Sequence, residues 1–264
     1  MRMSGLAGLV LAGVVLAPVA TVLTPPVAGA SAVSLCDQMG GQWNGQYCHA
    51  TVPSDEKAVR EINIAIPAEA DNPAIGGAIS NYLVQLMNNW RNAGKNMFQN
   101  SRGDANFEVF HHGNIHTVVF HETYDNESTG RFEGAAIQNG YRTFAFDSAS
   151  GRQVQLADII DPAAVARLGG PYIQAALDST TQAWPHEPGA YPFTLDRWTP
   201  DKVYSGGYKA WALTPDELIL YLPDYPVARD SGIDFTQTRY IWSFTGGDVQ
   251  PHIPLSALAP AMHM

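Results

Sequence analysis

Four of the eight histidines lie in one stretch, FEVFHHGNIHTVVFHETYD, which spans Phe107–Asp125. Histidines and acids at suitable spacing hold metal ions or exchange protons. Gly113-Asn114 is a two-residue turn typical of a β-hairpin, so His111 would face His116 across the two strands. His121 would point to the opposite face, because five residues separate it from His116. The histidine side chains of the hairpin therefore point to both faces of the sheet, and we predict neither a metal site nor a cofactor.

Motifs for catalysis are missing as well. The chain has no G-x-S-x-G elbow and no G-x-x-x-x-G-K-[ST] phosphate loop. His121-Glu122 does not begin an H-E-x-x-H motif, since Asp125 stands in place of the second histidine. We assign no catalytic residue and favour a protein without catalysis. The alternative is a secreted hydrolase, an esterase, which requires a serine close to a histidine in the fold.

Aromatic residues beside amides form a second pattern. Rings stack on the apolar faces of sugars, and amides bind hydroxyls. Such residues occur in the loop CDQMGGQWNGQYC and again in a Gly- and Pro-rich region further along. The predicted ligand-binding residues are Trp43, Asn44, Tyr47, Tyr204, Tyr208 and Trp211. Rings at these positions also fit a role in covering loops and core, and for Trp211 we favour that role.

The two cysteines, Cys36 and Cys48, delimit this loop. An exported chain keeps a disulfide, and closing a loop of about 15 residues contributes about 3 kcal/mol. Lipid modification of Cys36 is disfavoured, because Leu35 precedes it where a small residue is expected. We predict a Cys36–Cys48 disulfide.

The chain opens with an export signal. Arg2 precedes an apolar run over 6–23, and small residues follow up to Ala32. We predict a signal peptide over residues 1–32; the alternative is an uncleaved membrane anchor. The net charge is −10, and loss of Arg2 makes it −11. This excess of acid argues against nucleic-acid binding, and contact with a membrane is expected only through an uncleaved signal segment.

Periodicity predicts the remaining elements. Glu61–Pro67 alternates as a strand, and a helix capped at Asn72 runs to about Asn96. After the histidine hairpin, residues 141–147 and 152–160 form a strand pair. A helix begins after Asp161, is broken at Gly169-Gly170-Pro171 and restarts through Ile173 and Leu177.

The last third adds a turn and a buried strand. Thr214–Glu217 is a turn, and Leu218–Leu222 is a buried strand. The result is an α+β class with antiparallel sheet. It comprises a disulfide-tied N-terminal arm over 33–54 and an α+β domain over 55–264.

The C-terminal half resembles a known domain. The segments FAFDSASGRQVQLADII, WALTPDELILYLPDYPVA and VQPHIPLSAL are similar to secreted mycobacterial immunogenic proteins and to the extracellular part of lysozyme-sensing anti-sigma factors. The family-like part covers 141–260. The matching residues are Phe144, Phe146, Asp147, Gly151, Leu156, Asp158, Leu218, Tyr221, Pro223, Tyr225, Ile253, Pro254 and Leu255. The sequence AIQNGYRTF lacks the His-Pro loop of that family.

The resemblance implies a strongly bent antiparallel sheet packed against a few helices. The chain also looks like a mycobacterial mannan-binding group. We therefore expect a secreted or cell-envelope binding protein, an antigen, whose partner is a glycan such as mannan or an extracellular protein. Some relatives are described as esterases.

Overall fold

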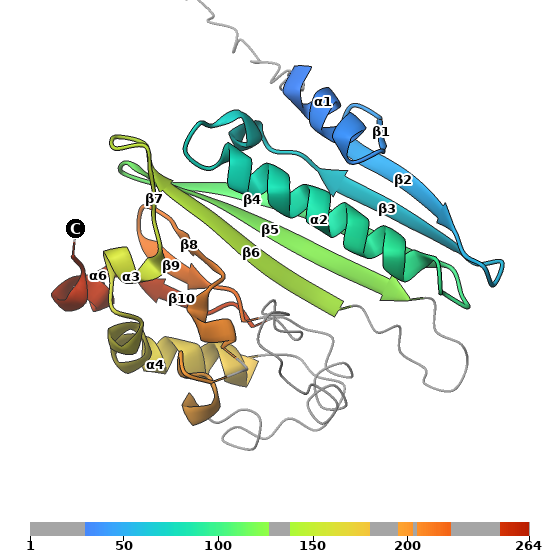
Figure 1. The fold of residues 1–264 in the computed structure, drawn as a ribbon. Helices are drawn as coiled ribbons and strands as arrows, with labels where there is room; N and C mark the ends of the chain where they lie inside the picture. Colours follow the sequence, from blue (N-terminus) through green and yellow to red (C-terminus); the bar gives the residue numbers. More distant parts are fainter. Residues whose placement is uncertain (1–29, 127–137, 180–194, 203–204, 223–248, 264) are drawn as a thin grey trace, which may run out of the picture.

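The computed structural model describes residues 30–126, 138–179, 195–202, 205–222 and 249–263. These residues form the predicted α+β architecture, with a strongly bent seven-stranded sheet and a separate three-stranded sheet (Figure 1). Over these ranges, no helix is both long and apolar enough to cross a membrane. The predicted signal segment lies outside the described residues up to position 29.

The strands of the large sheet are neighbours in chain order. They are β1 (Gln42–Trp43), β2 (Tyr47–Pro53), β3 (Val59–Ala65), β4 (Ser101–His112), β5 (Ile115–Asn126), β6 (Gln138–Asp147) and β7 (Arg152–Gln153). Every neighbouring pair is antiparallel except β3 and β4, which are parallel. Parallel neighbours need a crossover, and helix α2 (Gly76–Gly94) provides it.

Helix α2 covers one face of the large sheet (Figure 1). Its buried residues, including Ile79, Leu83 and Trp90, recur at helical spacing and form one apolar stripe. Alternate strand residues such as Ile62 and Ile64 pack in the same core. Because side chains alternate along a strand, the intervening residues lie on the outer face, away from α2.

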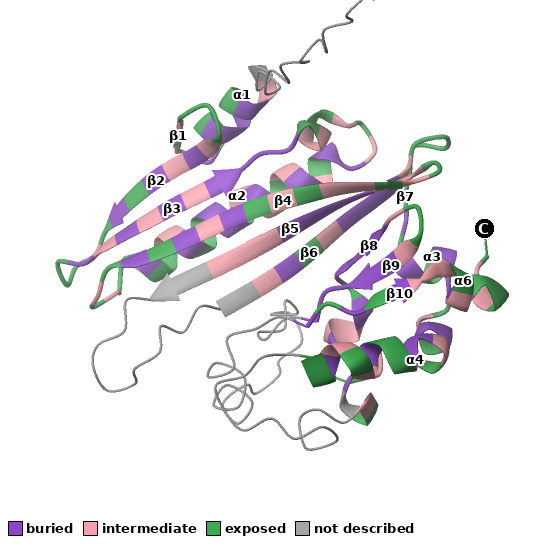
Figure 2. Ribbon diagram, turned by 180° about the vertical axis from the view of Figure 1, so that it is seen from behind, coloured by how far each residue is buried: buried purple, intermediate pink, exposed green. Residues whose placement is uncertain are grey.

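The small sheet comprises β8 (Trp211–Leu213), β9 (Glu217–Leu220) and β10 (His252–Pro254). It packs on the outer face near the β4–β5 turn. Thr143 Oγ1 donates to the Trp211 carbonyl at 2.7 Å and accepts from the Trp211 N–H at 2.8 Å, and His112 Nδ1 lies 2.9 Å from the Thr214 carbonyl. Figure 2 shows the small sheet on the β6–β7 side, far from β1–β3.

Further helical elements complete the described chain. They are α1 (Ala30–Gln38), η1 (Ala68–Asp71), α3 (Leu156–Ile159), α4 (Pro162–Ser179), η2 (Leu195–Arg197), η3 (Gly206–Tyr208), α6 (Leu255–Leu258) and η5 (Ala259–Ala261). The α3, α4 and α6 helices share a second apolar core with the small sheet.

The predicted disulfide joins α1 to β2. Cys36 and Cys48 are bonded, with their Cα atoms 5.2 Å apart, and both are fully buried. Strand β2 pairs with β3 along all seven of its residues. The N-terminal arm is therefore the edge of the large sheet, held there by both the crosslink and the strand ladder.

Several local predictions are confirmed. His111 lies opposite His116, and the β4–β5 register continues without a slip to the far end of the hairpin. Thr214 Oγ1 accepts from the Asp216 and Glu217 N–H groups, so this segment is a turn that leads into β9.

The prediction that Gly169-Gly170-Pro171 breaks a helix is wrong. Helix α4 continues through Pro171 to Ser179. A Cβ atom on Gly169 would lie 2.7 Å from Ile253 Cδ1, so the glycine lets β10 approach the helix. Tertiary packing here outweighs the local tendency to end the helix.

Two other boundaries differ from expectation. The Asn72 carboxamide accepts from the Ala74 N–H at 2.8 Å, and α2 itself begins at Gly76. The second strand expected over 152–160 is only β7, two residues long, followed by the α3 turn. In α3 the Gln155 N–H donates to Asp158 Oδ2 at 2.8 Å, which closes a capping box and favours helix over strand.

Candidate functional site

The β1–β2 hairpin carries the first predicted binding residues. Asn44 Oδ1 accepts from the Gln46 N–H at 3.0 Å and the Tyr47 N–H at 2.8 Å, and Gly45 adopts φ 98° between them. The Gln46 carboxamide in turn donates to the Tyr47 hydroxyl at 3.1 Å. Asn44 thus shapes the turn with its carbonyl oxygen, leaving only its NH2 group for a ligand.

The two aromatic rings of this hairpin lie on opposite faces. Trp43 is paired with Cys48, shares its face and packs against the core on the α2 side. Tyr47 precedes Cys48 and therefore points to the outer face. Both rings are half-buried, whereas Asn44 is exposed.

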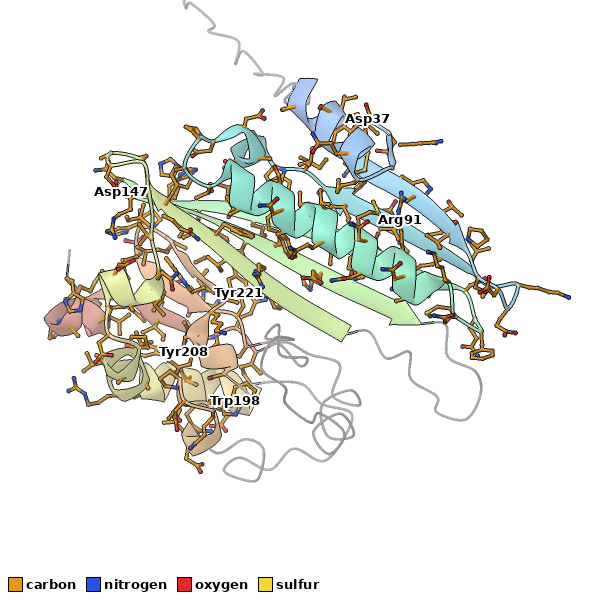
Figure 3. The ribbon with its side chains drawn as sticks, viewed as in Figure 1. Asp37, Arg91, Asp147, Trp198, Tyr208 and Tyr221 are labelled. Atoms are coloured by element: carbon orange, nitrogen blue, oxygen red, sulfur yellow. A yellow bond between two sulfur atoms is a disulfide. The ribbon has the colours of Figure 1, made fainter. Side chains whose placement is uncertain are left out.

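Tyr208 and Trp211 do not join this site. Tyr208 is 1% exposed and donates its hydroxyl to the Trp198 carbonyl at 2.7 Å. Burial raises the pKa of the Tyr208 phenol well above its usual range. Trp211 is 3% exposed on β8, and Tyr204 lies outside the described residues. Figure 3 places Tyr208 and Trp198 in the part of the molecule that carries the small sheet.

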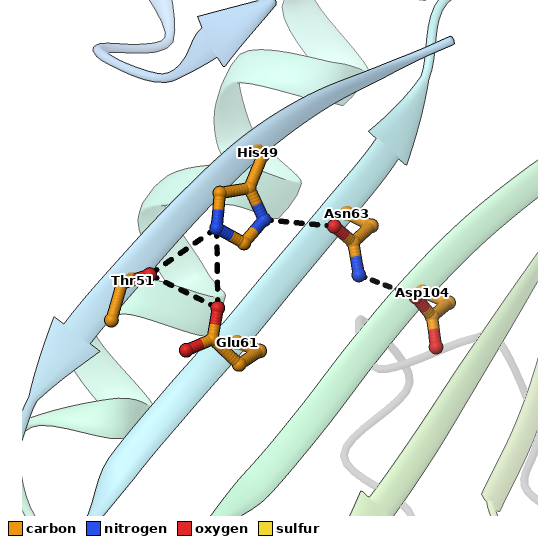
Figure 4. Close-up of polar contacts among 5 residues, drawn as sticks. All are labelled: His49, Thr51, Glu61, Asn63 and Asp104. Atoms are coloured by element: carbon orange, nitrogen blue, oxygen red, sulfur yellow. Dashed lines mark hydrogen bonds and ion pairs between the residues drawn. The ribbon is translucent and has the colours of Figure 1, made fainter. Parts of the chain in front are cut away.

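A row of polar side chains crosses the outer face beside Tyr47. It comes from three adjacent strands and was not predicted from the sequence. The polar row consists of His49 and Thr51 on β2, Glu61 and Asn63 on β3, and Asp104 on β4 (Figure 4). The His49 and Glu61 side chains are 35% and 42% exposed, so the row is open to solvent.

Hydrogen bonds connect the whole polar row. His49 Nδ1 lies 2.9 Å from Asn63 Oδ1, and Asn63 Nδ2 donates to Asp104 Oδ1 at 2.8 Å. His49 Nε2 lies 3.2 Å from Glu61 Oε2, and Thr51 Oγ1 donates to the same oxygen at 3.0 Å. Since Asp104 accepts from the Asn63 amide nitrogen, the amide oxygen is the atom that faces His49.

Arg102 lies beside the polar row on β4, opposite Glu61. Its Nε donates to Asp104 Oδ2 at 2.7 Å, so both carboxylate oxygens of Asp104 accept one hydrogen bond. Each oxygen retains a lone pair for a further donor. The polar row therefore presents fixed carboxylates, an amide and an imidazole on one face of three adjacent strands, which suits a ligand rich in hydroxyl groups.

The histidine hairpin carries a different arrangement. The rings of His111 and His116 meet edge-on at 4.3 Å, and His116 also contacts Phe146 at 4.9 Å. Burial, and then the neighbouring His111, lower the pKa of His116. His121 stacks on Tyr141 at 4.5 Å on the other face. In the part of the chain that the structure describes, no three His, Cys, Asp or Glu side chains gather as a metal ion would require.

Two families match parts of the chain. Residues 26–62 match a family described as "Mannan-binding protein", and residues 157–256 match "Protein of unknown function (DUF3298)". The first range includes α1, β1, β2 and the Glu61 end of β3, and therefore Tyr47 and most of the polar row. No curated protein sequence matches significantly.

Two crystal structures are similar to the chain. One is a DUF3298 family protein from Pseudomonas aeruginosa PAO1, with a TM-score of 0.44 and 10% identity over 82% of this chain and 91% of that chain. The other is a DUF3298 family member from Bacteroides fragilis NCTC 9343, with a TM-score of 0.41 and 12% identity over 83% and 92%. Both resemblances noted in the sequence thus have a matching family, while a mycobacterial origin and a link to anti-sigma factors stay predictions.

Proposed function

We propose that the chain is an exported or cell-envelope protein that binds a glycan, such as mannan, without catalysis. The glycan lies on the outer face, over the Tyr47 ring and the polar row. The observation that carries the proposal is the coincidence of two features. Residues 26–62 match a mannan-binding family, and the same segment contributes an aromatic ring and most of a hydrogen-bonded polar row on one face.

The chemistry of the face suits a hexose. The flat face of Tyr47 can stack against the C–H groups of a sugar ring. Glu61 and Asp104 accept hydrogen bonds from hydroxyl groups, and their oxygens are already held by Thr51 and Asn63. A preformed row loses little side-chain entropy when the ligand binds.

Titration calorimetry of the purified chain with soluble mannan tests the proposal. Tyr47→Ala should weaken binding about tenfold, the loss of one stacking contact. Phe98→Ala is the control, because this ring is 79% exposed and lies outside the site. It should leave the affinity unchanged.

Trp43→Ala decides between the two faces of the hairpin. We expect a smaller effect than for Tyr47→Ala, because the Trp43 ring lies on the α2 side. A loss confined to Trp43→Ala would move the site to that side. Absence of mannan binding by the wild-type chain would refute the sugar ligand, and ester turnover abolished by a single His or Ser substitution would establish the hydrolase instead.

A further inference from the structure

A groove runs along the free edge of β2. Its volume is about 670 Å³, and it lies between this edge and the C-terminal half of α2. The residues that matter for its chemistry are Gln42, Thr51, Asn88, Arg91, Asn92 and Lys95. The groove begins where the outer face ends, since His49 and Thr51 border both.

The charge of the groove is opposite to that of the chain. Arg91 and Lys95 line it, and its lining includes no carboxylate. Neither cation forms an ion pair within the described residues. The whole chain carries a net charge of −10. Two unpaired cations in one hollow of an acidic protein attract an anionic group.

Arg91 is held in position. Its guanidinium donates to the Gly40 carbonyl, and a Cβ on Gly40 would lie 3.0 Å from Arg91 Nη1. Gly40 also has φ 69°, which favours glycine. Figure 3 shows Arg91 on α2 beside the N-terminal elements. Arg91 Nε is buried and has no acceptor among the described residues. A fixed guanidinium without a carboxylate partner suits a carboxylate or phosphate of a ligand.

The backbone of β2 adds neutral hydrogen-bonding groups. The Asn44 N–H donates to the Tyr47 carbonyl, so the backbone groups of Tyr47, and of every second residue after it, point away from β3. β1 pairs only as far as His49. The N–H and C=O of Thr51 therefore face the groove, beside the amides of Asn88 and Asn92.

We propose that this groove binds the acidic group of an anionic glycan, a polysaccharide that carries carboxylate or phosphate groups. Arg91 and Lys95 bind the anion, and the amides and the Thr51 backbone bind nearby hydroxyls. The inference rests on the proposed function, because the glycan continues from the outer face around the β2 edge. It adds that the natural ligand is charged rather than neutral.

The test compares three ligands by calorimetry with the purified chain: neutral mannan, phosphate-bearing mannan and a polyuronate. We expect at least one anionic glycan to bind more tightly than neutral mannan. The double variant Arg91→Gln/Lys95→Gln should lose about tenfold or more in affinity for that anionic glycan and keep its affinity for neutral mannan. The preferred anion identifies the source, phosphate or uronic acid.

The matched control is Arg167→Gln/Lys209→Gln, which removes the same charge from α4 and the segment before β8. It should leave both affinities nearly unchanged. If the two double variants lose affinity for the anionic glycan equally, the effect is due to net charge alone and the proposal is overturned. The single variant Lys95→Gln controls for misfolding, because Lys95 is exposed and its side chain has no partner in the described structure. An unchanged affinity of this variant for the anionic glycan would also count against the groove.

The outcomes separate this inference from the proposed function. If neutral mannan binds tightly and no anionic glycan binds more tightly, the proposal that the groove binds an anion is refuted. The proposed glycan site on the outer face would then still stand. Binding of an acidic peptide, with no anionic glycan bound, would assign the β2 edge to strand addition and overturn the inference. If none of the three glycans binds, both the proposed function and the inference about the groove are refuted.

Discussion

Asn63 determines how the polar row is connected. Its amide nitrogen is committed to Asp104, so its oxygen meets His49, and His49 in turn reaches Glu61 and Thr51. The sequence contained a signal for this row, since His49 and Thr51 alternate with buried Cys48 and other core residues of β2. Alternation alone, however, does not give the register of three strands, and without the register these side chains cannot be paired.

His116 offers a residue-level prediction about pH. Its pKa is lowered from the ordinary value near 6.5 by burial first and by His111 second. As the pH falls through about 6.5, His116 therefore takes up a proton in the unfolded chain before it does so in the folded protein. The contribution of His116 to the free energy of unfolding is therefore lost below that pH. We expect NMR titration to give a His116 pKa below the ordinary value.

The variant His111→Ala serves as the companion measurement. It removes the lowering due to the neighbouring ring and should raise the His116 pKa part of the way back, while the effect of burial stays. A His116 pKa above 6.5 in the wild-type chain would contradict the edge-on packing of the two rings.

Helix α4 shows how packing between elements overrides local sequence. Gly169-Gly170-Pro171 has the composition of a helix end, yet the helix continues because Gly169 lies against Ile253 of β10. The histidine hairpin behaves oppositely: its Gly-Asn turn and apolar alternation fixed the pairing of β4 with β5 from local sequence. Elements defined by their own turns were predictable, and elements defined by a distant contact were not.

Substitution of Gly169 tests that contact. Gly169→Ala places a methyl group 2.7 Å from Ile253 Cδ1 and should reduce the free energy of unfolding by about 1–3 kcal/mol. Gly77→Ala is the matched helical control, because a Cβ there meets nothing within 4 Å, and it should increase stability by up to about 1 kcal/mol. Urea denaturation measures both; stabilisation by Gly169→Ala would show that α4 and β10 do not pack this closely.

The two parts of the chain that match families lie on different sides of the molecule. The mannan-binding match covers the β1–β3 edge of the large sheet, and the DUF3298 match covers the small sheet and its helices on the β6–β7 side (Figure 1). The aromatic residues singled out in the sequence fall in both parts. Of those that the structure describes, Trp43 and Tyr47 at the N-terminal edge are half-buried, whereas Tyr208 and Trp211 are buried. Periodicity and family resemblance predict the fold class, and aromatic residues beside amides predict a sugar ligand. Only the three-dimensional arrangement distinguishes Tyr47 from the buried Tyr208 and Trp211.

Mapping mannan on the protein by NMR tests the central claim most directly. Backbone amide shifts, recorded as mannan is added to the isotope-labelled chain, should change at Tyr47, Asn63 and Asp104 and stay constant in α4 and β8–β10. Shifts confined to the small sheet and its helices, with the β2–β4 outer face unaffected, would contradict a glycan site at the N-terminal edge.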